Sequence, residues 1–317
     1  MAQRRPWQDT RVLLTGASGF IGAHVLRRLR EQDADVHATS RVPPSNADGG
    51  TWHAIDLTDA DATTALIRSV RPDVVLHLAA TVSGARTIDM VSQTLWTNLV
   101  GSVTLLTALA DAPPDAVVFA GSIEESSLGD PAASASSPYA MAKLAATGYA
   151  TMFHRLWGVP VTVLRIATVY GPGQPDESKL VPHVITSLLD GVRPRLSRGS
   201  KLADWVYIDD VVTAILAAAR RPDANGQVIE IGSGEQVSVA RTVATIRDIL
   251  GTPLTAEFGV LPDRPFDHDQ RSHLVAADRL LDWRPDIGLT TGLGRTVDWY
   301  RNRRSAPQNS MSRQENP

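Results

Sequence analysis

The stretch Thr15-Gly16-Ala17-Ser18-Gly19-Phe20-Ile21-Gly22 decides the fold of this chain. A short apolar run precedes it and a helix-period segment, residues 21–30, follows it. The first two glycines let the backbone turn tightly, and Gly22 lets a helix pack closely on a strand. The N–H groups at the start of that helix then face a pyrophosphate. The spacing is G-x-x-G-x-x-G, and the position between strand and helix favours a dinucleotide site over a simple glycine-rich turn.

The same alternation of strand and helix continues through the first 165 residues. It predicts an α/β fold with a Rossmann-type, doubly wound parallel sheet. We expect strands to begin near Val12, Val36, Val74, Val117 and Val161. Helices are expected over residues 60–70, 94–110 and 139–156.

The regular alternation of strand and helix ends at Gly171-Pro172-Gly173. Beyond it, loops separate helical patterns at 179–189, 209–219, 240–250 and 291–300. This change predicts a smaller C-terminal substrate-binding lobe. We expect an N-terminal extension (1–10), a dinucleotide-binding domain (11–170) and a segment that forms mainly the lobe, with some parts returning to the sheet (171–304). The polar, aperiodic residues 305–317 predict a disordered tail.

Composition narrows the class of protein. The 317 residues are 43% hydrophobic and 21% charged with a net charge of -3, so the basic excess typical of nucleic-acid binding is absent. The chain contains no cysteine, which excludes disulfides and thiolate chemistry. No apolar run approaches a membrane span or a signal-peptide core, so we expect a cytoplasmic protein without membrane partners. The histidines lack metal-ligand spacing, so no metal is expected.

A second motif carries chemistry. Tyr139 and Lys143 stand four residues apart at the start of a predicted helix, so they share one helix face. The chain has only five tyrosines and three lysines, which makes a chance pair of this spacing rare. A phenol near a cation is suited to give a proton to a developing alkoxide. Ser122 follows a predicted strand, at the sheet edge where ligands bind. An exposed surface pair and a plain loop serine are the alternatives.

These motifs together resemble the extended short-chain dehydrogenase/reductase family, in its nucleotide-sugar epimerase/dehydratase branch, over residues 11–303. The resemblance implies that Ser122 hydrogen-bonds the substrate oxygen and that Tyr139 and Lys143 contact both substrate and cofactor. It further implies cofactor contacts from the glycine-rich turn, including Ser18, Phe20 and Ile21, and from Asp56, Leu57, Leu78, Ala79, Ala80 and Asn98. For Asp56 a loop role, and for Asn98 a structural role, stay open. The family also implies a homodimer packed through helices 94–110 and 139–156.

The end of the second strand bears on cofactor choice. An NAD-preferring enzyme usually places a carboxylate there for the ribose 2′-hydroxyl, whereas this chain reads Ala38-Thr39-Ser40-Arg41. Ser40 and Arg41 are able to bind a 2′-phosphate, so NADP(H) is favoured and NAD(H) stays possible. A solvated loop arginine is the alternative for Arg41.

The segments expected to bind the substrate also resemble this branch, with substitutions at two positions. Arg165 to Pro172 resembles R-x-x-N-V-Y-G-P with Thr168 for Asn, and Ala203 replaces an arginine often used on the diphosphate. Arg264 matches a second diphosphate arginine, which Lys201 would assist. We expect Thr81, Ser83, Thr168 and Arg264 to contact the substrate. Glu124 matches a dehydratase glutamate and is a fourth catalytic candidate, with a substrate contact or a plain surface glutamate as the alternatives. Ile123 cannot supply the acid that dehydration needs.

The resulting prediction is NADPH-dependent reduction of a nucleoside-diphosphate 4-keto-6-deoxyhexose. The runner-up is a nucleotide-sugar 4-epimerase that uses bound NAD. Two further alternatives are a reductase of a non-nucleotide carbonyl compound and a catalytically silent dinucleotide-binding regulator. Retention of Ser122, Tyr139 and Lys143 together argues against the silent regulator.

Overall fold

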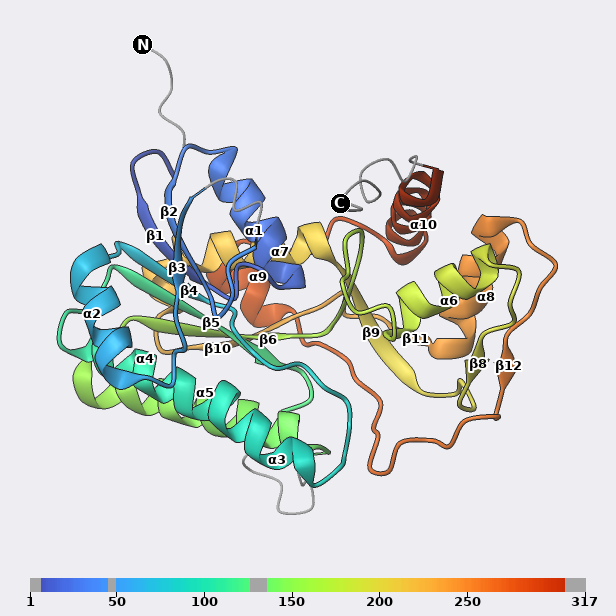
Figure 1. The fold of residues 1–317 in the computed structure, drawn as a ribbon, viewed down its shortest axis with the longest axis horizontal. Helices are drawn as coiled ribbons and strands as arrows, with labels where there is room; N and C mark the ends of the chain where they lie inside the picture. The colour runs from blue at the N-terminus through green and yellow to red at the C-terminus, as the bar shows by residue number, and fades with distance from the viewer. Residues whose placement is uncertain (1–6, 45–49, 126–135, 306–317) are drawn as a thin grey trace, which may run out of the picture.

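The computed structural model describes residues 7–44, 50–125 and 136–305 (Figure 1). Its larger body is a seven-stranded sheet in the order β10-β6-β5-β4-β1-β2-β3, with every neighbouring pair parallel. The strands are β1 (Arg11–Thr15), β2 (Asp35–Ser40), β3 (Thr51–Ala54), β4 (Val74–His77), β5 (Ala116–Ser122), β6 (Val161–Ile166) and β10 (Val228–Ile231). The predicted doubly wound α/β fold is confirmed, with a strand at each of the five expected positions.

Helices cover both faces of this sheet (Figure 1). One face carries α1 (Phe20–Arg30), α7 (Ile208–Ala218) and α9 (Val275–Leu281), and the other carries α2 (Ala60–Val70), α4 (Gly101–Ala110) and α5 (Pro138–Trp157). Two apolar clusters fill the space between the sheet and these helices: the first lies under α1, α7 and α9, and the second under α2, α4 and α5. In strand β1, Val12 and Leu14 pack into the first cluster, and Leu13 packs into the second. Successive side chains of this central strand point to opposite faces and are all apolar, as burial of both faces requires.

The predicted helix 94–110 differs from the structure. A short helix α3 (Asp89–Thr94) leads into a π-helical turn, η1 (Leu95–Val100), before α4 begins. Within η1, Asn98 is fully buried and its side chain bonds the backbone of Thr81, accepting from its N–H at 2.7 Å and donating to its carbonyl at 3.0 Å. The wider turn thus holds a buried amide against the loop after β4, which a regular helical period does not anticipate.

The smaller lobe contains β7 (Thr168–Tyr170), α6 (Leu180–Leu189), β8 (Arg195–Leu196), β9 (Leu202–Tyr207), β11 (Gln236–Ser238), α8 (Val239–Leu250), β12 (Glu257–Phe258) and α10 (Leu289–Ser305). Its strands form the sheets β11-β9-β7 and β12-β8. A third apolar cluster, which includes Tyr170, Ile185, Trp205 and Ile246, fills its interior. A 3₁₀ turn, η2 (Pro222–Ala224), precedes β10.

The chain ends add two details. Trp7, within the predicted N-terminal extension, is buried in the first cluster, and Arg220 lies over its ring at 5.5 Å. Residues 1–6 and 306–317, which hold most of that extension and most of the predicted tail, lie outside the described residues. Ser305, assigned to that tail, is instead the last residue of α10. Within the described ranges, no helix is both long and apolar enough to span a membrane.

Candidate active site

The sequence-predicted residues gather at the carboxyl ends of the parallel strands. Thr15 ends β1, His77 ends β4 and Ser122 ends β5, so the residues that follow them share one edge of the sheet. In doubly wound sheets this edge is where ligands bind. The smaller lobe contributes Thr168, at the start of β7, to the same region.

Helix α5 positions Tyr139 and Lys143. Ser137 caps the helix by accepting the N–H of Ala140 at 3.1 Å, and Pro138 occupies the first helical position. This combination fixes where the helix begins, because the cap satisfies a free donor and proline presets the backbone. Tyr139 therefore lies in the first turn and Lys143 one turn later.

These two side chains meet Ser122 in a buried group. Tyr139, Lys143 and Ser122 are 9%, 5% and 7% exposed. The phenol of Tyr139 shares a hydrogen bond with Ser122, whose Oγ also accepts the N–H of Glu124 at 3.2 Å. Lys143 Nζ donates to the carbonyl of Ala120 at 2.6 Å. The three residues thus form a buried cluster in which Tyr139 bonds Ser122 and Lys143 bonds the same strand, β5, at Ala120.

Burial shifts both titrating groups of this cluster toward their neutral forms. It raises the pKa of Tyr139, while the hydrogen bond from Ser122 opposes the rise. It lowers the pKa of Lys143 to about 8, against the opposing attraction of the Glu125 carboxylate. The cluster therefore holds a protonated phenol and, one helical turn further along α5, an ammonium group that titrates close to neutral pH.

The glycine-rich turn has the geometry of a phosphate cradle. Gly16 has φ +69, and a Cβ there would lie 2.6 Å from the N atom of Ala79. A Cβ on Gly22 would lie 2.1 Å from the carbonyl oxygen of Gly16. Gly19 is the N-cap of α1, and among the described residues no side chain caps that helix end. Its free N–H groups and dipole suit an anion, so these residues fit the pyrophosphate of a dinucleotide.

A buried hydrogen-bond chain connects this turn to η1. Thr15 Oγ1 and His77 Nδ1 are 2.8 Å apart, and His77 Nε2 and Ser102 Oγ are 2.9 Å apart. Ser102 Oγ donates to the carbonyl of Asn98 at 2.7 Å, so it accepts from His77. His77 therefore carries its proton on Nε2 and accepts from Thr15 at Nδ1. Thr15 Oγ1 in turn accepts the N–H groups of Leu78 and Ala79, each at 3.2 Å.

The predicted adenosine end lies beside β2. Ser40 Oγ lies 3.1 Å from Ser18 Oγ and donates to the carbonyl of Val42 at 2.9 Å. Asp56 accepts both the N–H and the hydroxyl of Thr58, and these bonds lower its pKa, as does the nearby Arg41. The structure therefore brings Ser18, Ser40, Arg41 and Asp56 to one place.

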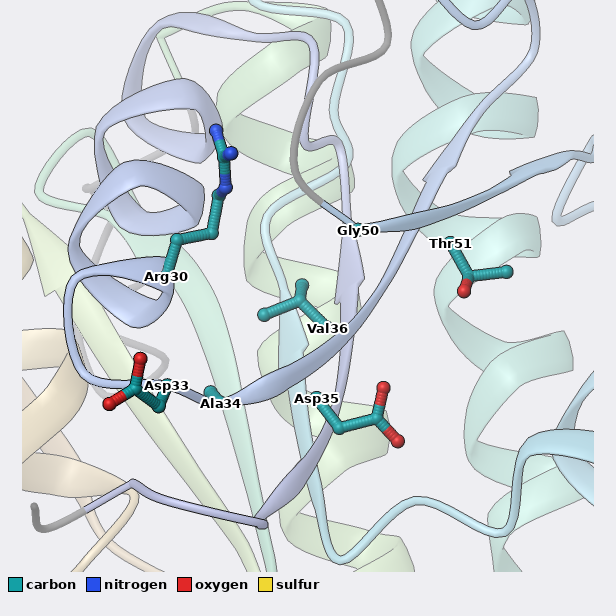
Figure 2. Close-up of a pocket in the computed structure, with 7 residues that line it drawn as sticks. All are labelled: Arg30, Asp33, Ala34, Asp35, Val36, Gly50 and Thr51. Carbon is teal, nitrogen blue, oxygen red and sulfur yellow. The ribbon is translucent and has the colours of Figure 1, made fainter.

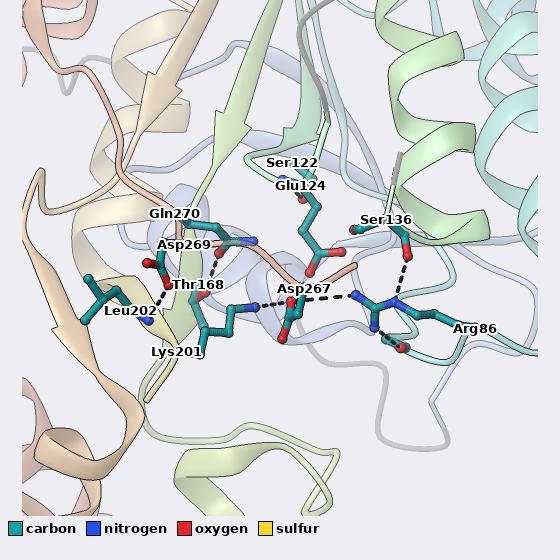
Figure 3. Close-up of polar contacts among 11 residues, drawn as sticks. Arg86, Ser122, Glu124, Ser136, Thr168, Lys201, Leu202, Asp267, Asp269 and Gln270 are labelled. Carbon is teal, nitrogen blue, oxygen red and sulfur yellow. Dashed lines mark hydrogen bonds and ion pairs between the residues drawn. The ribbon is translucent and has the colours of Figure 1, made fainter. Parts of the chain in front are cut away.

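Charged side chains meet on the predicted substrate side of the site (Figure 3). Lys201 Nζ lies 2.5 Å from Asp267 Oδ1, and Arg86 lies 3.6 Å from the same oxygen. Arg86 also donates to the carbonyl of Ser136 at 2.7 Å. Figure 3 shows Glu124 extending from beside Ser122 toward Asp267. Two cations and a carboxylate from separate loops thus face the candidate catalytic group.

The remaining predicted substrate contacts surround this cluster. Thr168 Oγ1 lies 3.4 Å from Gln270 Oε1. Arg264 lies so close to Gly84 that a Cβ there would be 2.5 Å from its Nη1. Ser83 Oγ accepts the N–H of Ala85 at 3.2 Å. Ala203, which stands where the family often has arginine, is buried in the core of the lobe.

Two members of the site were not predicted from the sequence. Arg86 lies in the loop after β4 without a motif, and only its charge marked it. Glu125 is buried and follows Glu124 directly, so the Glu124-Glu125 pair after Ser122 was the available signal. The adjacent Glu124 drew the functional interpretation instead.

A separate polar hollow lies away from the catalytic cluster (Figure 2). Its lining comes from the end of α1 and the amino-terminal part of β2 and β3: Arg30, Asp33, Ala34, Asp35, Val36, Gly50 and Thr51. Because Asp35 begins β2 and Ser40 ends it, the hollow is at the opposite end of the strand from the adenosine region. We assign no chemistry to it.

Comparison with known proteins agrees with this geometry. The chain matches the NAD dependent epimerase/dehydratase family over residues 12–232. It is 32% identical to UDP-glucose 4-epimerase of Mycolicibacterium smegmatis, over 92% of this chain and 99% of that protein. It is also 32% identical to dTDP-glucose 4,6-dehydratase of Streptomyces antibioticus, over 93% of each.

Two solved structures extend the likeness to the fold. UDP-glucose 4-epimerase from Thermotoga maritima with UDP-glucose has a TM-score of 0.84 at 27% identity, covering 92% of this chain and 99% of that one. UDP-glucuronic acid 4-epimerase from Bacillus cereus, in complex with UDP-glucuronic acid and NAD, has a TM-score of 0.80 at 25% identity with the same coverage. The chain therefore belongs to the NAD-dependent epimerase/dehydratase family, the nucleotide-sugar branch of the extended short-chain dehydrogenase/reductase enzymes.

Proposed function

We propose that this enzyme transfers a hydride at C4 of the hexose of a nucleoside-diphosphate sugar, and that its net reaction is reduction of a 4-keto-6-deoxyhexose. The observation that carries the proposal is the buried cluster at the end of β5, in which the Tyr139 phenol shares a hydrogen bond with Ser122 and Lys143 follows one helical turn later. A proton donor and an oxygen-binding hydroxyl at the ligand-binding edge suit carbonyl chemistry.

In this proposal each residue has one role. Ser122 hydrogen-bonds the C4 oxygen and orients the carbonyl. Tyr139 stays protonated because burial raises its pKa, and it gives its proton to that oxygen as the negative charge develops. The Lys143 ammonium stabilises the resulting phenolate. The nicotinamide cofactor that the glycine-rich turn would hold would supply the hydride when bound.

The glycine-rich turn and the end of β2 indicate which residues would bind the cofactor. The amides at the start of α1, with Gly16, Gly19 and Gly22, would hold the pyrophosphate. Ser40 and Arg41 would bind a 2′-phosphate, because β2 ends without a carboxylate that repels it. This feature supports NADP(H), while NAD is the cofactor in the Bacillus cereus structure.

Binding of the substrate diphosphate would use cations of both bodies. Lys201 and Arg86 already face one anion, the Asp267 carboxylate, and Arg264 lies nearby against Gly84. Two diphosphate charges would replace the single carboxylate between Lys201 and Arg86. This arrangement supports compensation for the arginine that Ala203 replaces.

Epimerisation at C4 is the second candidate. Full-length similarity at 32% identity to UDP-glucose 4-epimerase of Mycolicibacterium smegmatis favours it. Tyr139, as a phenolate stabilised by Lys143, would then take the proton of the C4 hydroxyl while the hydride would pass to bound NAD. The hydride would be returned to C4 on the opposite face of the sugar and the proton to the C4 oxygen, with Ser122 binding that oxygen throughout. Dehydration is not favoured, because Ile123 offers no acid.

One pair of assays separates these candidates. The enzyme is mixed with NADPH and a nucleoside-diphosphate 4-keto-6-deoxyhexose, and nicotinamide absorbance and product mass are followed. Stoichiometric loss of NADPH with a gain of two hydrogens supports reduction. Conversion of UDP-glucose to its C4 epimer, with no net change in cofactor, moves the assignment to the epimerase. Failure of both reactions contradicts hydride transfer at C4.

We also propose a homodimer formed through α3, η1 and α5. These elements pack on one another and leave a group of apolar side chains exposed: Ile88, Val91, Leu95, Trp96, Met141, Tyr149, Leu156 and Trp157. Trp96 is 58% and Leu156 65% exposed, which is costly for a monomer in water. A second copy of the same face would cover them.

A further inference from the structure

Glu125 is a buried carboxylate directly after the candidate catalytic strand. Its side chain has no exposed surface, and that of its ion-pair partner Arg165 is 16% exposed. Burying a charge is costly unless it is paired and fully hydrogen-bonded. A glutamate in this position therefore needs a specific set of partners.

Three donors from three different elements provide that set. The N–H of Ser122 donates to Oε1 at 2.7 Å, Thr147 Oγ1 donates to Oε2 at 2.8 Å, and Arg165 Nε donates to Oε2 at 3.0 Å. Ser122 ends β5, Thr147 belongs to α5 and Arg165 belongs to β6. One carboxylate thus joins the strand that carries Ser122 to the helix that carries Tyr139 and Lys143.

The spacing along α5 makes this connection selective. Tyr139, Lys143 and Thr147 follow one another at intervals of four residues, so they lie along one helix face. A Cβ on Gly121 would lie only 2.7 Å from Glu125 Oε1. The absence of a side chain at Gly121 therefore leaves space for the carboxylate beneath Ser122.

The carboxylate also acts on Lys143 through its charge. Burial lowers the pKa of Lys143 to about 8, and the attraction of Glu125 opposes this shift. Without the negative charge the ammonium form would be less stable, so the lysine would lose its proton at a lower pH.

We propose that Glu125 is a positioning residue, which holds the Ser122 backbone and the active face of α5 in one arrangement and keeps Lys143 in its ammonium form. This inference rests on the proposed function for its kinetic consequence only. Its electrostatic consequence is measurable without any substrate.

The first experiment is a proton titration of Lys143. The 317 residues include three lysines, Lys143, Lys179 and Lys201, so protein labelled with ¹³C at lysine Cε gives three signals, which Lys→Arg variants assign. We expect a midpoint near 8 for wild-type Lys143 and a lower midpoint in Glu125→Gln. Because Glu125→Gln leaves Arg165 buried without its anion, Glu125→Gln/Arg165→Gln is titrated as well, with the same downward shift expected.

Asp210→Asn is the matched control for loss of a buried carboxylate. Asp210 is 4% exposed and accepts the N–H groups of Asp286 and Ile287, away from α5. It should lower stability without moving the Lys143 midpoint. If a folded Glu125 variant titrates Lys143 at the wild-type midpoint, the electrostatic part of the proposal is overturned.

The second experiment uses kcat on the nucleotide sugar that the wild type converts. The basic limb of the kcat profile should move to lower pH in the Glu125 variants, whereas a loosened fold alone lowers kcat at every pH. Thr147→Val keeps all charges and cuts one anchor, so kcat should fall about tenfold with the Lys143 midpoint unchanged.

The Lys143 titration and the kcat measurement together separate failure of the positioning role from failure of the proposed function. A shifted Lys143 midpoint without turnover of any tested sugar supports the Glu125 charge effect and contradicts the proposed function. If neither Glu125 variant folds, Thr147→Val decides, and an unchanged kcat overturns the positioning role.

Discussion

Thr15 Oγ1 donates a hydrogen bond to His77 Nδ1 across 2.8 Å, between the last residues of neighbouring strands β1 and β4. The bond requires a neutral imidazole, because a protonated ring has no acceptor nitrogen. Burial, followed by the field of Lys143, lowers the pKa of His77 to about 3. The connection between the glycine-rich turn and the loop after β4 therefore depends on an uncharged histidine.

This histidine should make the fold sensitive to acid. Between about pH 6.5 and 3 the unfolded chain binds a proton at His77 that the folded chain does not, so stability falls as pH falls. In His77→Gln the slope of unfolding free energy against pH should be shallower, by up to about 1.4 kcal/mol per pH unit. Denaturant unfolding at several pH values measures both slopes. Parallel curves would show that His77 does not titrate in this way.

Removing the phenol tests the proposed acid. Tyr139→Phe should reduce kcat by about 10²–10⁴-fold while cofactor affinity stays nearly unchanged, because only the proton donor is lost. Turnover assays and cofactor fluorescence titrations measure the two quantities. A variant that retains wild-type kcat would exclude Tyr139 as the donor.

Arg41 is the proposed selector for the 2′-phosphate. Arg41→Ala should raise the KM for NADPH by the loss of a charge-assisted contact of about 1.5–3 kcal/mol, with little effect on NADH. Initial rates with the two cofactors provide the comparison. An equal effect on both would return the preference to NAD.

Two glycines provide a matched test of the cradle. Gly22→Ala would place a Cβ 2.1 Å from the carbonyl oxygen of Gly16, so it should weaken dinucleotide binding and destabilise the fold by about 1–3 kcal/mol. Gly148→Ala, within α5, meets no heavy atom within 4 Å and should stabilise by up to about 1 kcal/mol. Thermal unfolding and cofactor titration measure both. Equal behaviour of the two variants would contradict the close packing at Gly22.

The exposed apolar face of α3, η1 and α5 should direct dimer formation. Sedimentation of the wild-type protein is expected to give a dimer, and Trp96→Glu/Leu156→Glu should shift it toward monomer by placing charges in the contact. Val275→Glu, at another exposed apolar position on α9, serves as the control. A wild-type monomer at micromolar concentration would remove this proposal.

Short sequence patterns predicted the fold well, because each strand, helix and turn carries its own signal in neighbouring residues. The glycine turn and the continuous apolar strands follow from packing on two faces, and helix 60–70 begins and ends where its pattern placed it. The π-helical turn at Leu95–Val100 was missed because Asn98 is drawn to the Thr81 backbone, a partner distant in sequence. Helix α10 continues to Ser305, and its Arg304 binds Asp190 and the carbonyl of Thr186, which are again partners distant in sequence.

The site was predictable to the extent that its residues lie in short motifs. Ser122, Tyr139 and Lys143 converge as the sheet topology requires, because strand ends and the following helix share one edge. Glu125 and Arg86 depend on partners about 20 to 180 residues away, such as Thr147 and Asp267. Pairings of that kind arise only when segments distant in the sequence are brought together by the fold, so single-sequence patterns do not contain them.

The order of elements has a consequence for how the protein can be divided. After β6 the chain enters the smaller lobe with β7, returns to the large sheet with α7 and β10, leaves again with β11, returns with α9 and ends in the lobe with α10. No contiguous fragment therefore consists of the lobe alone, and no single cut separates the two bodies. The large sheet and the lobe should consequently fold and unfold together. A candidate active site formed by both bodies therefore exists only in an uncut chain.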